Sequence, residues 1–372
     1  MKFHIPLSYN PINPDEIVAV LRKYEGRHHN DIIADFEQSL CEITGAAHAV
    51  ALSSGTAAIH LALKAVDVEA GDYVFAPTFT YVATVNPILY LGAQPVLIDS
   101  ERITWNIDPE LLEYALQDCA KKHRLPKAII AVHTYGMMAD MEALCSIAGK
   151  WGIPVIEDAA EALGSALHGK SAGTWGTVGI FSFNNNKLVT SYGGGALITH
   201  DARIAARVRF LAAQSREQNL HYEHHEVGYN YQMGPINAAC GLVSLKHMPQ
   251  GIIHRKNAHE WYKKKLADNM SFPQGLKGSH SNYWLTAGTF SQPGARDKVL
   301  ANLLQNNIEA RLCWKPMHMQ PLFRDALAYH NGVAADLFSK GICLPSGKGV
   351  NEPEWERVTT KITEVINAGG SN

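Results

Sequence analysis

One lysine of this chain has neighbours that are unusual for a lysine. Lys187 follows an apolar run at 177–183 and three asparagines, and no other charged residue lies beside it. Three glycines at 193–195 and a second apolar run at 196–199 come next, so two buried strands would flank it. Such a lysine is suited to forming a Schiff base with a carbonyl compound. Taken alone, a loop lysine beside a glycine-rich turn is the simpler interpretation.

Two further segments could bind an anion and a ring nitrogen. Ser54, Gly55 and Thr56 stand between a predicted strand and a predicted helix, where backbone N–H groups can face a phosphate. An ordinary helix N-cap explains that segment equally simply. Asp158 stands at the end of an apolar strand, at the sheet edge where open α/β proteins bind ligands. A carboxylate there could hold a protonated heterocyclic nitrogen, although helix capping explains it about as well.

An aromatic ring and a hydroxyl complete the set. Phe79 follows another predicted strand, in the segment 77–81, and could stack on a flat cofactor, although core packing is the usual role of a single aromatic residue. Ser182 is placed to reach a phosphate. An anion cradle, an acid, a stacking ring and an isolated lysine are together the parts of a pyridoxal phosphate site.

Composition limits the class of protein. The chain has 372 residues, of which 46% are hydrophobic and 18% charged, as expected of a folded soluble protein. A formal net charge of -2 gives no reason to expect nucleic acid or a membrane as partner. No apolar run approaches the ~20 residues that span a bilayer, and the N-terminus lacks the apolar core of a signal peptide. The six cysteines form no CxxC pair and the 18 histidines no HExxH motif, so we expect free thiols in a reducing cytoplasm and no metal site.

Strands and helices alternate along the first two thirds of the chain, which predicts an α/β fold with a mostly parallel sheet covered on both faces. The predicted strands are 48–52, 73–76, 95–98, 128–132, 155–156, 177–183 and 196–199, and the predicted helices are 13–24, 32–44, 57–63, 82–91, 109–120 and 141–151. The alternation weakens after Met248. We therefore predict a large domain at 1–248 and a smaller C-terminal α/β domain at 249–372.

Taken in order, these segments resemble the DegT/DnrJ/EryC1/StrS sugar aminotransferases, which are fold type I pyridoxal phosphate enzymes. The resemblance covers nearly the whole chain, at 36–37, 54–58, 77–80, 132–136, 157–162, 181–187, 228–231, 314–318 and 344–345.

The resemblance implies a role for each cofactor residue. Lys187 would be the catalytic lysine that forms the Schiff base, Asp158 the partner of the pyridine nitrogen, and Glu161 a neighbour of the ring hydroxyl. The phosphate would be held by Ser54, Gly55, Thr56 and Ser182, and Phe79 would stack on the ring. Asn230 would reach the phosphate of a neighbouring subunit, because the family builds its active sites across a homodimer interface.

Further segments are similar to the transaminases of bacillosamine synthesis, which aminate C4 of UDP-4-keto-6-deoxy-N-acetylglucosamine with L-glutamate as donor. These segments are 214–217, 221–224, 228–231, 282–286 and 342–347. The similarity implies that the nucleotide sugar is held by Arg216, His221, Tyr222, Arg311, Trp314, Lys315 and His318. A dTDP- or GDP-linked sugar stays open, as do the stereochemistry at C4 and the pathway served.

The chain departs from the family pattern near the lysine. Asn185 stands where glycine is common, which could alter the loop, and the residue before Gly194 is not the usual acid. Two alternatives to an aminotransferase make different demands on these residues. A related C3 dehydratase would carry histidine at the lysine position, and a non-catalytic binding protein would be expected to lose Asp158 or Lys187.

Overall fold

The computed structural model describes residues 3–28 and 30–369. Its main sheet has eight strands in the order β1-β9-β8-β5-β4-β2-β3-β14. The five pairs from β8 to β14 are parallel, and β9 is antiparallel to both of its neighbours. The predicted mostly parallel sheet is therefore confirmed.

The elements have the following bounds. The strands of the main sheet are β1 (His48–Leu52), β2 (Tyr73–Pro77), β3 (Gln94–Ile98), β4 (Ala128–Val132), β5 (Val155–Asp158), β8 (Val178–Ser182), β9 (Gly195–Thr199) and β14 (Ala328–Tyr329). The helices around it are α1 (Pro14–Arg22), α2 (Asp31–Thr44), α3 (Gly55–Ala65), α4 (Val82–Tyr90), α5 (Pro109–Lys121), α6 (Met141–Trp151), α7 (Ala202–Ala212) and α8 (Pro235–Lys246).

Apolar residues cover both faces of this sheet, as its strand sequences require. In β4, Ile129 and Ala131 pack in one core with α2, α5, α6 and α8, whereas Ala128 and Ile130 pack in the other with α3, α4 and α7. Successive side chains of a strand point to opposite faces, so a strand buried on both sides must be apolar throughout.

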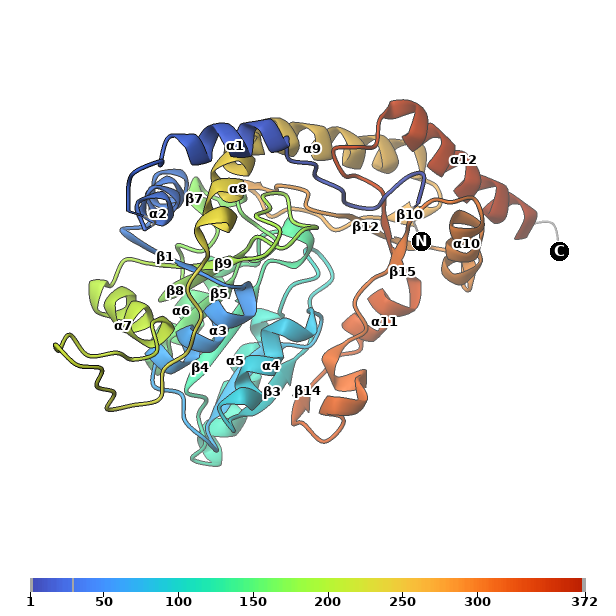
Figure 1. Cartoon of the computed structure of the whole chain (residues 1–372). Coiled ribbons are helices and arrows are strands. Elements are labelled where there is room, and N and C mark those ends of the chain that lie inside the picture. The colour runs from blue at the N-terminus through green and yellow to red at the C-terminus, as the bar shows by residue number, and fades with distance from the viewer. Residues whose placement is uncertain (1–2, 29, 370–372) are drawn as a thin grey trace.

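The C-terminal part builds a second, antiparallel sheet. The helix α9 (Met248–Lys265) runs from the main body toward α10 (Ala295–Gln305) and α12 (Glu352–Gly369) (Figure 1). The second sheet has the order β10-β12-β15-β13, with β10 (Met270–Ser271), β12 (Thr286–Phe290), β13 (Arg311–Leu312) and β15 (Gly341–Leu344). A three-stranded sheet joins β11 (Ser279–His280), β6 (Ala166–Leu167) and β7 (Lys170–Ser171).

Each half of the chain contributes a segment to the part of the fold that the other half builds. The strand β14 pairs with β3 of the main sheet, and α11 (Val333–Lys340) leads from it back to β15. At the other end, Ile5 forms a bridge to Ile308 and packs in the core beside the second sheet. A domain division after residue 248 stays a prediction. Because β14 pairs with the main sheet and Ile5 packs beside the second sheet, such a division would not be clean.

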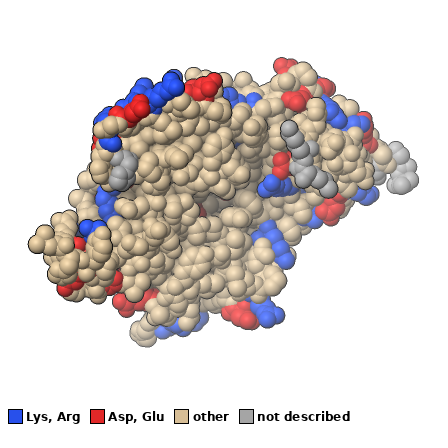
Figure 2. Space-filling view, viewed as in Figure 1, with Lys and Arg blue, Asp and Glu red and all other residues tan. Residues whose placement is uncertain are grey.

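Charged side chains show no segregation on the face of the molecule in Figure 2, where basic and acidic groups alternate around the periphery. No helix among residues 3–28 and 30–369 is long and apolar enough to cross a membrane.

The packing of β8 predicts the effect of one added methyl group. A Cβ at Gly179 would lie 2.1 Å from the carbonyl oxygen of Gly173, whereas a Cβ at the exposed helical Gly149 would meet no atom within 4 Å. We expect Gly179→Ala to destabilise the protein by about 2–3 kcal/mol, because a packed backbone has to move. Gly149→Ala should stabilise it by about 0.5–1 kcal/mol, because alanine favours the helix. Urea unfolding of both variants measures this, and equal effects would contradict the packing of β8.

Candidate active site

A cavity of ≈ 560 Å³ opens at the carboxyl ends of the parallel strands. Its walls come from the loops after β1, β2, β5 and β8, and from two C-terminal segments that carry Trp284 and Trp314. Nine of the predicted site residues line it: Ser54, Gly55, Thr56, Asp158, Glu161, Ser182, Lys187, Arg311 and Trp314. The fold thus brings together side chains that are up to 260 positions apart in the chain.

Lys187 is the basic group at the floor of this cavity. Its side chain is only 13% exposed, and its Nζ lies 3.5 Å from Glu161 Oε1. Nζ also stands 3.9 Å from the ring centroid of Trp284, a cation–π distance. The Asn10 side chain donates a hydrogen bond to the Lys187 carbonyl oxygen at 2.6 Å, so the N-terminal segment fixes the lysine backbone.

Asp158 lies at the end of β5, buried in the cavity wall. Thr84 Oγ1 donates to its Oδ2 at 2.7 Å, and the N–H of Ala160 donates to its Oδ1 at 3.2 Å. Burial raises the pKa of the Asp158 carboxyl, and these two donors together with Lys187 oppose that rise. A cation opposite Asp158, such as a protonated ring nitrogen, would compensate the remaining desolvation.

Glu161 follows Asp158 by three residues and is also buried. Burial raises the pKa of its carboxyl to about 7, although Lys187 and the N–H of Tyr135 oppose the rise. The Tyr135 N–H donates to Glu161 Oε2 at 2.7 Å.

The residues predicted to hold a phosphate lie where α3 meets β8 and β9. Ser54 caps α3 by accepting from the N–H of Ala57 at 3.0 Å, so its hydroxyl serves the helix. The first N–H groups of α3 face the cavity, because an α-helix leaves them without partners inside the helix. A Cβ on Gly195 would lie 2.4 Å from the nitrogen of Gly55, and a Cβ on Gly55 would lie 3.0 Å from the Cβ of Ser182. These glycines let three backbone segments approach one another closely.

Phe79 does not line the cavity, so the prediction that it stacks on the cofactor ring is wrong. It is fully buried, with its ring edge-on to Trp105 and Tyr135 in a core cluster. The chain turns at the end of β2, and Phe79 points back into the protein. Tyr81, two residues later, is 54% exposed and lines the cavity, with its ring 5.3 Å from that of Trp314.

Six other predicted contacts lie outside this cavity. Lys315 and His318 follow Trp314 in the chain. His318 Nδ1 forms a hydrogen bond with the Thr78 hydroxyl at 2.7 Å. The remaining four are exposed residues of the long segment after α7: Arg216, His221, Tyr222 and Asn230. The Arg216 guanidinium lies 4.5 Å from the Tyr222 ring centroid, so these two contact each other.

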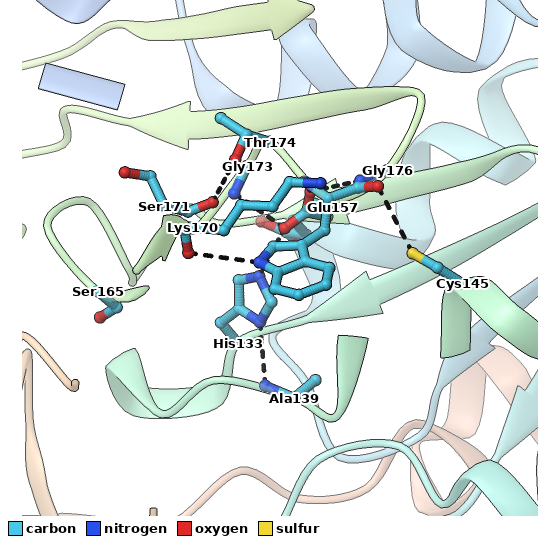
Figure 3. Close-up of polar contacts among 12 residues, drawn as sticks. His133, Ala139, Cys145, Glu157, Ser165, Lys170, Ser171, Gly173, Thr174 and Gly176 are labelled. Atoms are coloured by element: carbon cyan, nitrogen blue, oxygen red, sulfur yellow. Dashed lines mark hydrogen bonds and ion pairs between the residues drawn. The ribbon is translucent and has the colours of Figure 1, made fainter. Parts of the chain in front are cut away.

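Glu157, beside Asp158, points to the other side of β5 and holds the fold. Its carboxylate accepts the N–H groups of Gly173, Trp175 and Gly176 (Figure 3). His133 accepts the Ala139 N–H on Nδ1, so its ring proton is on Nε2 and is donated to Glu157 at 3.0 Å. Four donors satisfy this carboxylate, and it anchors the loop before β8.

The loop to Lys187 needs no glycine at the position of Asn185, since Asn185 is not among the residues of positive φ. The following turn does need glycine: Gly193 and Gly194 have φ of 144° and 127°. A Cβ on Gly194 would lie 2.8 Å from Ser191 Oγ.

Four residues that sequence reasoning missed complete the site: Thr84, Tyr81, Tyr135 and Trp284. Trp284 donates its Nε1 hydrogen to the carbonyl oxygen of Asn186 at 2.8 Å, beside the lysine. Thr84 carried a detectable signal, since it lies about one helical turn after the strand-end segment 77–81. Tyr135 and Trp284 lie in the segments 132–136 and 282–286 that carry the resemblance, but only the tertiary structure shows that they contact Glu161 and Lys187.

These residues fit pyridoxal phosphate. The cavity offers a cradle of N–H groups for the phosphate, a buried carboxylate that lacks a cationic partner, and an amine for the aldehyde.

The raised pKa of Glu161 predicts a pH-dependent stability of the cofactor-free protein. Between about pH 4.5 and 7 the folded state binds more protons than the unfolded state, so the free energy of unfolding falls as the pH rises. In Glu161→Gln this effect is absent. The difference in unfolding free energy, variant minus wild type, should therefore rise by on the order of 3 kcal/mol from pH 4.5 to pH 8. Urea titrations at several pH values measure it. A flat difference for Glu161→Gln would contradict the buried carboxyl.

Known proteins are similar to this chain in both sequence and fold. The DegT/DnrJ/EryC1/StrS aminotransferase family matches residues 13–363. EpsN of Bacillus subtilis (strain 168) is 45% identical over 333 residues, 88% of this chain and 86% of EpsN. GDP-perosamine synthase of Caulobacter vibrioides is 34% identical over 340 residues, 90% of each chain. A UDP-N-acetyl-3-dehydro-alpha-D-glucosamine 3-aminotransferase of Acidithiobacillus ferrooxidans is 32% identical over 333 residues, 89% of this chain and 87% of that enzyme.

A solved structure agrees with these relatives. The structure of a DegT DnrJ EryC1 StrS aminotransferase from Brucella abortus superposes with a TM-score of 0.88 at 28% identity, covering 94% of this chain and 95% of that one. The chain therefore belongs to the DegT/DnrJ/EryC1/StrS aminotransferase family and is a pyridoxal phosphate-dependent nucleotide-sugar aminotransferase.

Proposed function

We propose that this enzyme transfers the amino group of L-glutamate to C4 of a nucleotide-linked 4-keto-6-deoxy sugar. The substrate would be UDP-2-acetamido-2,6-dideoxy-hexos-4-ulose and the product UDP-4-amino-4,6-dideoxy-N-acetylglucosamine. The observation that carries the proposal is the buried Lys187, held beside Asp158 and Glu161 at the carboxyl ends of the parallel strands. Support for the UDP sugar comes from the segments similar to bacillosamine transaminases, one of which supplies Trp284 to the cavity wall.

Each wall of the cavity has a task in this proposal. When bound, pyridoxal phosphate supplies an electron-accepting ring that stabilises negative charge on the carbon that loses a proton. Asp158 would hold the proton on the ring nitrogen, and the α3 N-terminus with Ser182 would hold the phosphate. Lys187 would move the proton at C4 of the sugar. Tyr81 would give the ring a flat contact surface, because its side chain is exposed in the cavity.

A GDP-linked sugar is the second candidate, favoured by the relative that is named GDP-perosamine synthase. The cationic residue at the cavity mouth, Arg311, would suit a diphosphate in either case. All six cysteines are free, in keeping with the cytoplasmic location that we include in the proposal.

A homodimer is part of the proposal, because four predicted contacts lie away from the cavity of their own chain. Arg216, His221, Tyr222 and Asn230 are exposed on one long segment. In a dimer with two-fold symmetry, the same segment of each copy could reach the cavity of the other copy. Lys315 and His318 lie outside the cavity, so they would contact the sugar nucleotide only if substrate binding moved them toward it.

A substrate panel tests the reaction. The purified protein, given L-glutamate and the UDP-, GDP- or dTDP-linked 4-keto-6-deoxy sugar, should form 2-oxoglutarate fastest with the UDP sugar that carries the 2-acetamido group. Lys187→Ala should lose activity by about 10⁴-fold or more and lose the near-visible absorbance of the bound cofactor, because no other amine can replace it. Release of 2-oxoglutarate with the GDP sugar alone would replace our first candidate by the second.

Mixed dimers test the shared site. Lys187→Ala and Asn230→Ala should each be nearly inactive alone. After mixing under conditions that exchange subunits, half of the dimers would contain both variants, and each of these would hold one intact site, so about a quarter of wild-type activity should return. No recovery despite proven subunit exchange would show that Asn230 serves the cavity of its own chain or none.

A further inference from the structure

Glu161 is oriented by its neighbours so that one oxygen faces Lys187. The Tyr135 N–H binds Oε2 at 2.7 Å, and the Asn282 side chain donates to the Glu161 carbonyl oxygen at 2.9 Å. Oε1 is left 3.5 Å from Lys187 Nζ. This separation is longer than a direct charge-assisted hydrogen bond, and a small side-chain rotation would close it.

The strained backbone of Tyr135 helps to hold the Glu161 carboxyl in this orientation. Tyr135 has a left-handed conformation with φ 56° and ψ 19°, which is uncommon for a residue with a side chain. Its ring lies between those of Trp284 and Trp314, at 6.4 and 5.6 Å, and its hydroxyl accepts the Trp314 N–H at 3.0 Å. Packing therefore holds Tyr135 in the conformation that directs its N–H to Glu161.

The lysine needs a nearby proton acceptor. An ammonium group is neither a nucleophile nor a base, and only 13% of the Lys187 side chain is exposed to solvent. Asp158 is a poorer acceptor, because both of its oxygens already accept hydrogen bonds, from Thr84 and from Ala160.

We propose that Glu161 is the proton acceptor of the Lys187 amine, and that the two side chains exchange one proton inside the cavity. In this step an N–H bond of the ammonium group breaks and an O–H bond forms on Glu161 Oε1. An ion pair becomes a neutral pair, and no electrons are gained or lost. The inference rests on the role of Lys187 in the proposed function and adds a task for Glu161 beyond contact with the cofactor.

The surrounding charges suit this exchange near neutral pH. Burial raises the pKa of Glu161 to about 7, and Asp158 raises it further, while Lys187 and the Tyr135 N–H lower it. The buried Tyr135 hydroxyl and the Cys343 thiol also interact with Glu161, and burial raises the pKa of Tyr135.

The test is the rate at which the cofactor-free protein takes up pyridoxal phosphate, followed by the near-visible absorbance of the covalently bound form between pH 5.5 and 9. In the wild type the rate should rise through a step near pH 7, because a protonated Glu161 cannot accept a proton. Glu161→Gln keeps an acceptor for the Tyr135 N–H but cannot take the proton. It should lack the step and be slower at pH 8 by about 100-fold.

Control variants separate the outcomes. Glu161→Asp should keep a step and recover part of the rate, and the exposed Glu142→Gln should behave as the wild type. A Glu161→Gln profile that keeps the step, at a rate within about twofold of the wild type, would overturn the inference. Circular dichroism checks that each variant is folded, and if Glu161→Gln is not, an Asp variant without the step would overturn the inference equally.

The same experiment distinguishes failure of the inference from failure of the proposed function. Uptake with the expected step, but without amination of any 4-keto sugar, would refute the proposed substrate and support the proton exchange. Undiminished covalent uptake by Lys187→Ala would refute both.

Discussion

A lysine amine and two carboxylates share one cavity, and little of any of the three side chains is exposed to solvent. Removing charges from water is costly, so each group has to find partners inside the protein. Asp158 takes two donors, Glu161 takes one donor and the lysine, and Lys187 takes a carboxylate and the face of an indole ring. Asp158 could still take a cation, and Lys187 could still react with an aldehyde. Pyridoxal phosphate provides both, through its protonated ring nitrogen and its aldehyde.

The cavity exists only because distant segments are tied across it. Asn282 is fully buried, donates to the carbonyl oxygens of Glu161 and Leu163, and accepts the N–H of Trp284. A Cβ on Gly136 would lie 2.0 Å from Asn282 Oδ1, so glycine is needed where these segments cross. One amide side chain thus links the loop after β5 to the C-terminal segment that covers the lysine.

Much of the fold and part of the site could be predicted from the sequence. Strands buried on both faces are apolar runs, and residues at their carboxyl ends meet at one edge, so Lys187 and Asp158 could be placed by local pattern alone. Phe79 was misplaced because the direction of a side chain after a strand depends on the turn that follows. The roles of Trp284 and Tyr135 could not be derived from the sequence, since no local pattern shows that residues 97 and 52 positions away from Lys187 reach its site.

The site also shows why adjacent acids have different tasks. Glu157 and Asp158 are neighbours on β5 but point to opposite sides of the strand. Glu157 is satisfied by three backbone N–H groups and His133, and it anchors the loop before β8. Asp158 has fewer donors and faces the cavity, so it is the carboxylate that remains available to a ligand.

The most direct measurement is an electron-density map of the protein crystallised with pyridoxal phosphate. We expect continuous density from Lys187 Nζ to the cofactor, the ring nitrogen within hydrogen-bonding distance of Asp158, and the phosphate at the N-terminus of α3. Density for the cofactor at another lysine, or a ring nitrogen turned away from Asp158, would contradict the assignment of the site.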